Sequence, residues 1–193
     1  SYNNSTQFEN TLISSVCKKL LSYISLFNNP NNIIISFDGV APIAKLNQQR
    51  SRRYKSQFTN SIIENFTADS QVKWNTAAIT PGTNFMAKLD NKVKLFFKKY
   101  NNVIVFGSDT PGEGEHKICK HIRDNCNYYD NILIYGLDAD LIMLGLNHLN
   151  YCKNIFLYRE TPTYISNLNS DLDINSHYIF DINSLSNDII FKL

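Results

Sequence analysis

The sequence predicts an α/β protein with a mostly parallel central sheet flanked by helices. Three short apolar runs, Ile33–Phe37, Val103–Phe106 and Ile132–Tyr135, have the length of buried strands. Gly, Asn or Pro residues bound each run, and segments of helical length separate them. The last two runs are therefore expected to belong to a β-α-β unit with parallel strands, which spans Val103–Gly145.

Apolar residues at helical spacing predict the intervening helices. The first helix is expected from Phe8 to Phe27, where Asn29-Pro30-Asn31 stops the pattern. A second is expected to start after Pro42, and a third after Gly82. The third would turn its apolar residues inward and its lysines outward. Its predicted core residues are Phe85, Met86, Leu89, Val93, Phe96 and Phe97.

The region after Leu149 predicts less regular structure. Ile155–Tyr158 has the composition of another strand of the sheet, and Tyr178–Phe180 is expected to be an edge strand. Between them, Tyr164–Asn175 is expected to be a polar insertion with no evident chemistry.

Composition places the chain among globular intracellular proteins. Its 193 residues, 43% of them apolar, suit one α/β domain over residues 1–193. No apolar run approaches the ~18 residues of a membrane span. The four cysteines have no metal-ligand spacing and are expected to be reduced thiols, in the cytoplasm or the nucleus. The chain opens without Met, in a polar run, so we expect it to be a piece of a longer protein.

Carboxylates follow all three predicted strands. Glu113 and Glu115 come after the second, Asp138 and Asp140 after the third, and Asp38 directly after the first. Because ligands collect at the carboxyl ends of parallel strands, these acids are expected at one rim of the sheet. They would repel one another unless cations lay between them, and hard oxygen ligands suit magnesium or manganese.

Helix capping is the alternative role for the same residues. Thr110 to Glu113 has the pattern of a capping box with Pro at the first helical position, and Asp140 fits a cap for the helix from Leu141. For Asp38, the alternative is a simple Asp-Gly turn. A cap does not require the second carboxylate two residues from the first, which occurs at both turns.

The helix after Pro42 carries cationic and amide donors on one face. Lys45, Gln49, Arg52 and Arg53 fall at positions i, i+4, i+7 and i+8. Such a face is either an ordinary solvated surface or a site for an anion. Because a short link joins it to Asp38, a phosphate held there would lie beside the acidic rim.

Five segments, in order, resemble the XRN family of 5′→3′ exoribonucleases. The resemblance implies that Asp38, Glu113, Glu115, Asp138 and Asp140 belong to an acidic cluster holding two Mg²⁺ or Mn²⁺ ions. It also implies a PIN/FEN-like nuclease architecture and hydrolysis of single-stranded RNA with a 5′-monophosphate. The 5′-phosphate pocket would consist of Lys45, Gln49, Arg52 and Arg53. The five segments are Asp38–Arg53, Ile79–Met86, Pro111–Lys117, Gly136–Gly145 and Leu157–Glu160.

The sequence also departs from the family pattern. The family's cluster includes an Asp before the first helix and another in a Gly-Asn-Asp motif, and neither has a counterpart here. Ile43 stands at a position that is usually basic in the family. Two alternatives therefore stay open: a catalytically incomplete nucleic-acid-binding module, and a flap or PIN-like DNA nuclease. The sequence predicts neither the residues that stack on the first RNA base nor the oligomeric state of the protein.

Overall fold

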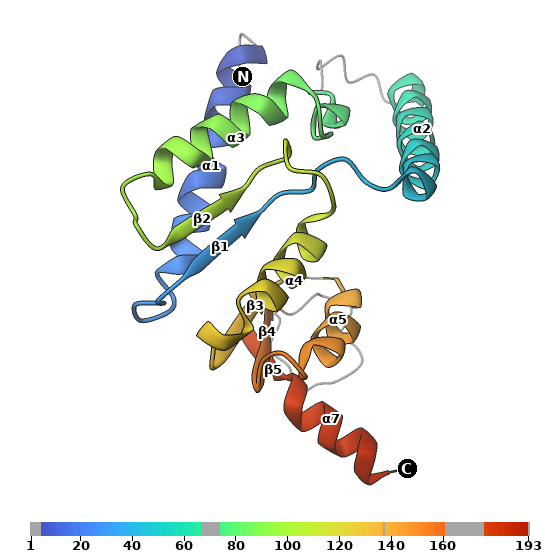
Figure 1. Ribbon diagram of the computed structural model, residues 1–193. Helices are drawn as coiled ribbons and strands as arrows, with labels where there is room; N and C mark the ends of the chain where they lie inside the picture. Colours follow the sequence, from blue (N-terminus) through green and yellow to red (C-terminus); the bar gives the residue numbers. More distant parts are fainter. Residues whose placement is uncertain (1–4, 67–73, 137, 161–175, 193) are drawn as a thin grey trace. The chain divides into compact units, whose positions relative to one another are not determined.

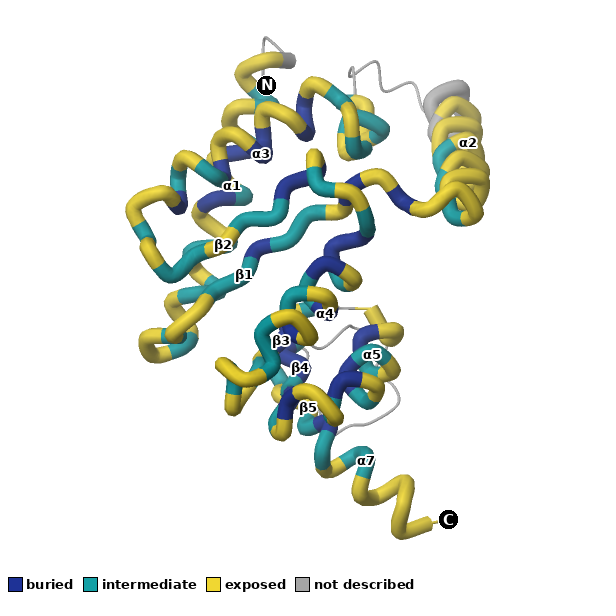
Figure 2. The backbone as a smooth tube through the Cα atoms, viewed as in Figure 1, coloured by how far each residue is buried: buried dark blue, intermediate teal, exposed yellow. Residues whose placement is uncertain are grey.

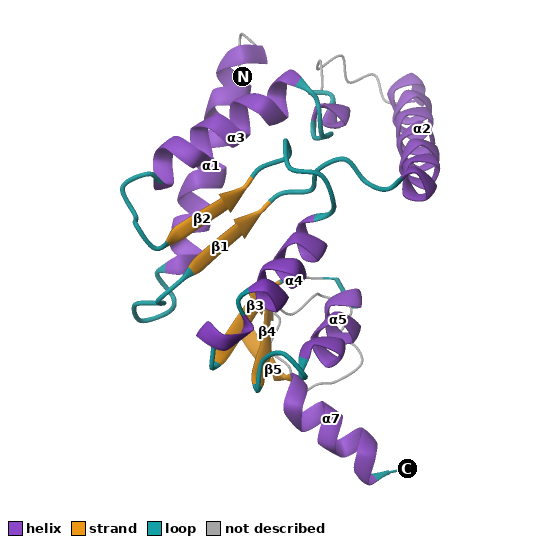
Figure 3. Cartoon of the chain, viewed as in Figure 1, coloured by secondary structure: helices purple, strands orange, loops and turns teal. Residues whose placement is uncertain are grey.

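The structure is a computed structural model that describes residues 5–66, 74–136, 138–160 and 176–192. The chain divides into two compact units, Ser1–Lys117 and Ile118–Leu193. Figures 1 and 3 show helices alternating with short strands along the chain. The predicted insertion at Tyr164–Asn175 lies outside the described residues.

The first unit contains a two-stranded parallel sheet. Strand β1 (Ile33–Ser36) pairs with β2 (Val103–Phe106), with Ile33 opposite Val103 and Ser36 opposite Phe106. Both strands therefore end at the same edge of the sheet. The other elements are α1 (Ser5–Ile24), α2 (Ile43–Phe66), the 3₁₀ helix η1 (Thr76–Ala78), α3 (Asn84–Phe97) and the first turn of α4 (Gly114–Asp124).

Helices α1 and α3 form the core of this unit with the sheet. Ile13 and Cys17 of α1 and Ile35 of β1 are buried together with the apolar face of α3. Thr83 caps α3 by accepting a hydrogen bond from the amide of Met86 at 3.3 Å. Five of the six core residues predicted for α3 are buried, and Phe96 packs partly buried against the cluster. The prediction for this helix is confirmed.

Helix α2 is different, because its described side chains are mostly exposed (Figure 2). Tyr54 and Phe58 are 67% and 68% exposed. The helix begins at Ile43, directly after Pro42, as predicted. Its stability therefore depends less on burial than that of α1 or α3.

The second unit contains a three-stranded sheet in the order β3-β4-β5. Strand β3 (Asn131–Tyr135) is parallel to β4 (Asn154–Glu160), and β5 (His177–Asp181) is antiparallel to β4 at the edge. The predicted strands after Leu149 are thus confirmed. The remaining elements are the end of α4, the 3₁₀ helix η2 (Cys126–Tyr128), α5 (Asp140–His148) and α7 (Ile182–Phe191).

One apolar cluster holds the second unit together. Ile155 and Ile182 are fully buried, and Leu141 of α5 packs beside them. Gly145 favours this close packing, because a Cβ there would lie 3.1 Å from the Ile182 side chain, which would have to shift slightly. Asp181 caps α7 by accepting hydrogen bonds from the amides of Asn183 and Ser184.

The predicted α/β class is confirmed, and the strand pairing is more divided than expected. Strand β2 pairs with β1 and β3 pairs with β4, so in the described ranges the strands form two sheets. A single, mostly parallel central sheet therefore stays a prediction. The apolar pattern locates strands, but partner choice depends on contacts distant in sequence. Among the described residues, no helix combines the length and apolarity needed to cross a bilayer.

Candidate functional site

The loops after β1 and β2 are joined by backbone hydrogen bonds. The amide of Gly39 donates a hydrogen bond to the carbonyl of Gly112 at 2.8 Å, and the amide of Gly112 donates one to the carbonyl of Val40 at 3.0 Å. Only glycine fits at position 39, because a Cβ there would lie 1.9 Å from the carbonyl oxygen of Thr110. The two strand ends are therefore held close together.

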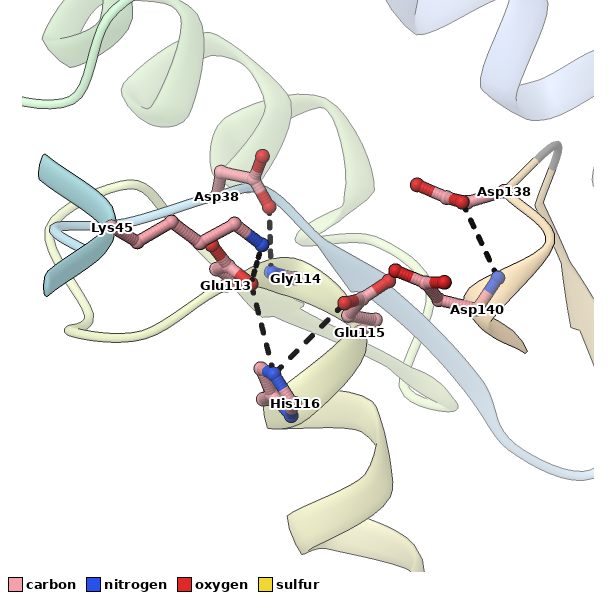
Figure 4. Close-up of polar contacts among 8 residues, drawn as sticks. All are labelled: Asp38, Lys45, Glu113, Gly114, Glu115, His116, Asp138 and Asp140. Atoms are coloured by element: carbon pink, nitrogen blue, oxygen red, sulfur yellow. Dashed lines mark hydrogen bonds and ion pairs between the residues drawn. The ribbon is translucent and has the colours of Figure 1, made fainter. Parts of the chain in front are cut away.

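Asp38 caps helix α4 from the neighbouring strand. Its Oδ1 accepts a hydrogen bond from the amide of Gly114 at 2.7 Å (Figure 4). A carboxylate at a helix N-terminus is stabilised by the free amides and the helix dipole. The predicted capping box at Thr110–Glu113 is wrong, since α4 begins at Gly114 and receives its cap from a residue distant in sequence.

Two carboxylates and an imidazole converge at the start of α4. One ligand atom from each of Glu113, Glu115 and His116 lies within 4.8 Å of the others. Nε2 of His116 is 3.7 Å from Oε2 of Glu113 and 3.9 Å from Oε1 of Glu115 (Figure 4). Carboxylate oxygens suit Mg²⁺ and Mn²⁺, and an imidazole nitrogen also suits transition metals, so this donor set fits a divalent cation.

His116 was not among the predicted metal ligands. A lone histidine just past an acidic turn is ordinarily a helix-surface residue, and its side chain is indeed 59% exposed. The signal that identifies it is spacing: position 116 follows Glu113 by three residues, so the two share one helix face.

Lys45 links helix α2 to this acidic turn. Its Nζ lies 2.7 Å from Oε2 of Glu113, whose side chain is 8% exposed. The sequence predicted Lys45 as a phosphate ligand, and the structure gives it a carboxylate partner. The positive charge of Lys45 lowers the free-energy cost of burying the Glu113 carboxylate.

The predicted phosphate-binding face is the least exposed face of α2. Lys45, Gln49 and Arg53 are half-buried, and the other described side chains of the helix, including Arg52, are exposed. A hollow of about 300 Å³ lies on a different face of the helix, and of the four predicted residues only Arg53 lines it. Its lining residues are Leu46, Arg50, Arg53, Tyr54 and Gln57.

The remaining two predicted acids lie at the carboxyl end of β3. Oδ1 of Asp138 accepts a hydrogen bond from the amide of Asp140 at 3.3 Å, and both residues are exposed. The local cap is thus Asp138, because Asp140 is itself the first residue of α5 and Ala139 provides no side-chain cap. The structure brings Asp38, Glu113 and Glu115 to one turn and Asp138 to Asp140, and one cluster of all five stays a prediction.

A buried lysine is hydrogen-bonded to the turn from Gly107 to Gly112, which leads into the acidic residues at the start of α4. Nζ of Lys117 donates hydrogen bonds to the carbonyls of Gly107 and Thr110, both at 2.9 Å. Burial lowers the pKa of the Lys117 ammonium, and the charge of Asp38 opposes that shift. The Lys117 side chain therefore points toward the turn from Gly107 to Gly112.

The paired parallel strands and the acidic residues at the start of α4 define an α/β protein whose carboxylates, beside the sheet edge, fit a divalent cation. Residues 1–161 match the family described as XRN 5'-3' exonuclease N-terminus. The chain belongs to this family.

The individual relatives described here are named 5'-3' exoribonucleases. The chain is 39% identical over 175 residues to 5'-3' exoribonuclease 1 of Saccharomyces cerevisiae, an alignment covering 77% of this chain and 11% of the relative. It is 41% identical over 132 residues to 5'-3' exoribonuclease 1 of Homo sapiens, covering 58% and 8%. It is 42% identical over 145 residues to 5'-3' exoribonuclease 2 of Eremothecium gossypii, covering 59% and 15%. The chain therefore spans a small part of the length of these relatives.

Proposed function

We propose that this chain supplies the metal-binding and end-recognition parts of a 5′→3′ exoribonuclease that acts on single-stranded RNA with a 5′-monophosphate. The observation that carries the proposal is the ion pair between Lys45 and Glu113, because it joins the basic face of α2 to the acidic turn. The family match over residues 1–161 supports a PIN/FEN-like nuclease domain, which we propose to extend over residues 1–193, and the relatives' names support the activity.

The acidic residues would hold two divalent ions, Mg²⁺ or Mn²⁺. We propose Asp38, Glu113 and Glu115 as oxygen ligands, and Asp138 and Asp140 as further ligands. When bound, such ions lower the pKa of the attacking water and stabilise the leaving 3′-oxygen. The carboxylates then act as ligands and need not exchange protons themselves.

The half-buried face of α2 would hold the 5′-phosphate. Lys45, Gln49 and Arg53 present an ammonium, an amide and a guanidinium along one stripe, with Arg52 at its exposed margin. An arginine fork and a lysine are the side chains that bind phosphate oxygens most strongly. A monophosphate seated beside the acidic turn would place the first phosphodiester bond at the metal ligands, which gives the direction of degradation.

Degradation of defined RNAs tests this function. Single-stranded RNA bearing a 5′-monophosphate, a 5′-triphosphate or a 5′-hydroxyl is incubated with this chain and with the complete product of its gene, in Mg²⁺ or EDTA. We expect the complete product to degrade only the monophosphorylated RNA, and only with Mg²⁺.

Three other outcomes would contradict the proposal. Equal cleavage of 5′-hydroxyl and 5′-monophosphate RNA would reject the phosphate pocket. Binding of RNA without degradation by either protein would establish a catalytically incomplete binding module. Faster cleavage of branched DNA than of single-stranded RNA would establish a flap or PIN-like DNA nuclease.

Fractionation of cells producing the tagged gene product would show whether the protein is in the cytoplasm or in the nucleus.

A further inference from the structure

Asp90 of α3 is a buried carboxylate that contacts the turn from Gly107 to Gly112 and belongs to no predicted site. It is 4% exposed, and its Oδ2 accepts hydrogen bonds from the amide and the hydroxyl of Ser108 at 2.8 and 2.6 Å. In the part of the chain that the structure describes, its Oδ1 has no hydrogen-bond partner. Gly107 lies against the same group, because a Cβ there would be 3.0 Å from Cγ of Asp90.

Lys117 holds the same turn from the α4 side. It is 8% exposed and binds the carbonyls of Gly107 and Thr110. Asp90 and Lys117 are thus two buried charged side chains that use backbone groups of one turn as their partners. Buried charges are expensive unless they are paired directly, and apolar residues of similar size often stabilise a fold as well or better.

The turn held in this way leads directly into the candidate metal ligands. Gly112, the last residue of the turn, forms backbone hydrogen bonds with Gly39 and Val40. Glu113 comes next, and its carbonyl accepts a hydrogen bond from the amide of Lys117 at 3.0 Å. A shift of the turn would therefore displace Glu113 relative to Asp38. Groups that orient metal ligands in this manner ordinarily change metal affinity about 10- to 100-fold when they are removed.

We propose that Asp90 and Lys117 are positioning residues that fix the turn from Gly107 to Gly112 from two sides and so set the geometry between Asp38 and Glu113. The inference rests on the proposed function, because it requires that these carboxylates bind a divalent cation. Neither side chain acts on the substrate.

Calorimetric titration with Mn²⁺ of the complete gene product tests the proposal. Asp90→Leu removes the acceptor for Ser108, whereas Asp90→Asn keeps one carbonyl oxygen that accepts from both Ser108 donors. Lys117→Met removes the two donors with little change of length. We expect Mn²⁺ affinity to fall about tenfold or more in Asp90→Leu and Lys117→Met and to stay within about threefold in Asp90→Asn.

Lys94→Met is the matched control, because Lys94 also lies on α3 and binds the same turn, through the exposed Asp109 at 2.9 Å. We expect it to change Mn²⁺ affinity less than about twofold. Loss of affinity should accompany a lower kcat on 5′-monophosphorylated RNA with KM within about twofold, since the phosphate-binding helix is untouched. A protein that only lost stability would show a lower Tm with unchanged Mn²⁺ affinity per folded molecule.

Each outcome decides between the two proposals. If the wild-type protein binds Mn²⁺ and Asp90→Leu binds it as tightly as Lys94→Met does, the positioning role is overturned and the proposed function stands. If Asp90→Asn loses as much affinity as Asp90→Leu, hydrogen bonding to Ser108 is not what fixes the turn, and the role is likewise overturned. If the wild-type protein binds no Mn²⁺, both proposals fail.

Discussion

The turn from Gly107 to Gly112 and helix α2 differ in how firmly the rest of the first unit holds them. The turn from Gly107 to Gly112 is held by buried side chains of α3 and α4 and by backbone bonds to the loop after β1. Helix α2 exposes most of its described surface, and the ion pair Lys45–Glu113 links it to the residue that follows this turn. The proposed metal ligands are thus preorganised, whereas the proposed phosphate ligands lie on a helix open to solvent.

This difference separates two kinds of mutational effect. Metal ligands must be positioned closely for catalysis, so changes at the turn should lower kcat. A solvated cationic face contributes mainly to binding and to the choice of RNA end, so changes on α2 should raise KM or relax end preference.

Glu113→Gln should have the largest effect on catalysis. It removes a charged metal ligand and the partner of Lys45 at once, so we expect kcat on 5′-monophosphorylated RNA to fall by about 100-fold or more. Single-turnover degradation measures the loss. RNA binding in EDTA, followed by fluorescence anisotropy, should stay within about threefold, and a parallel collapse of binding would contradict the separation.

Phe97→Ala and Phe58→Ala compare one substitution in the two regions. Phe97 is 2% exposed at the end of α3, and Phe58 is 68% exposed on α2. Emptying a buried aromatic site should lower the free energy of unfolding by about 3 to 5 kcal/mol, whereas the exposed site should change it by less than about 0.5 kcal/mol. Urea denaturation measures both, and equal losses would show that α2 is packed as tightly as α3.

Arg53→Ala should relax the preference for a 5′-monophosphate. Arg53 is half-buried on the predicted phosphate face, so we expect the ratio of kcat/KM for monophosphorylated over 5′-hydroxyl RNA to fall about tenfold. Arg52→Ala should lower it less, because Arg52 is exposed. Lys55→Ala, on the same helix but off this face, is the control for net charge. If all three variants lower the ratio equally, the helix acts only as a diffuse positive charge.

Lys94→Met should have a small effect on stability that depends on pH. Its ion pair with Asp109 joins side chains that are 39% and 64% exposed, so solvent screening limits the loss to about 1 kcal/mol or less. The hydrogen bond from Lys94 holds the pKa of Asp109 below its ordinary value of 3.8. Because the folded-state pKa is lowered, this stabilisation is present above pH 3.8 and is lost as pH falls through the folded pKa. Unfolding curves of both proteins should therefore converge in acid.

The local elements could be predicted from the sequence, because their patterns are local. The helix after Pro42, the apolar face of α3 and the strand ends at Asp38 and Asp138 follow from periodicity and from turn residues. Helix α4 was predicted to begin too early, since its cap comes from Asp38, 76 residues before Gly114. Sequence spacing carries no information about a partner at that separation.

The support of the acidic turn could not be predicted for a related reason. Asp90 stands among lysines and asparagines that suggest a solvated helix face, and only the tertiary structure shows it buried under Ser108. Lys117 looks like an ordinary helix lysine until its burial is known. The choice between capping and metal binding also depended on geometry: Asp38 caps α4 through one oxygen and leaves the second available.

Crystallography of the complete gene product with Mn²⁺, using the anomalous signal of the metal, tests the central claim most directly. We expect an Mn²⁺ peak at coordination distance, about 2.1 Å, from a carboxylate oxygen of Glu113 or Glu115, with Lys45 displaced from Glu113. An Mn²⁺ ion bound only elsewhere, with the Lys45–Glu113 pair intact, would contradict the assignment of this turn as the metal site.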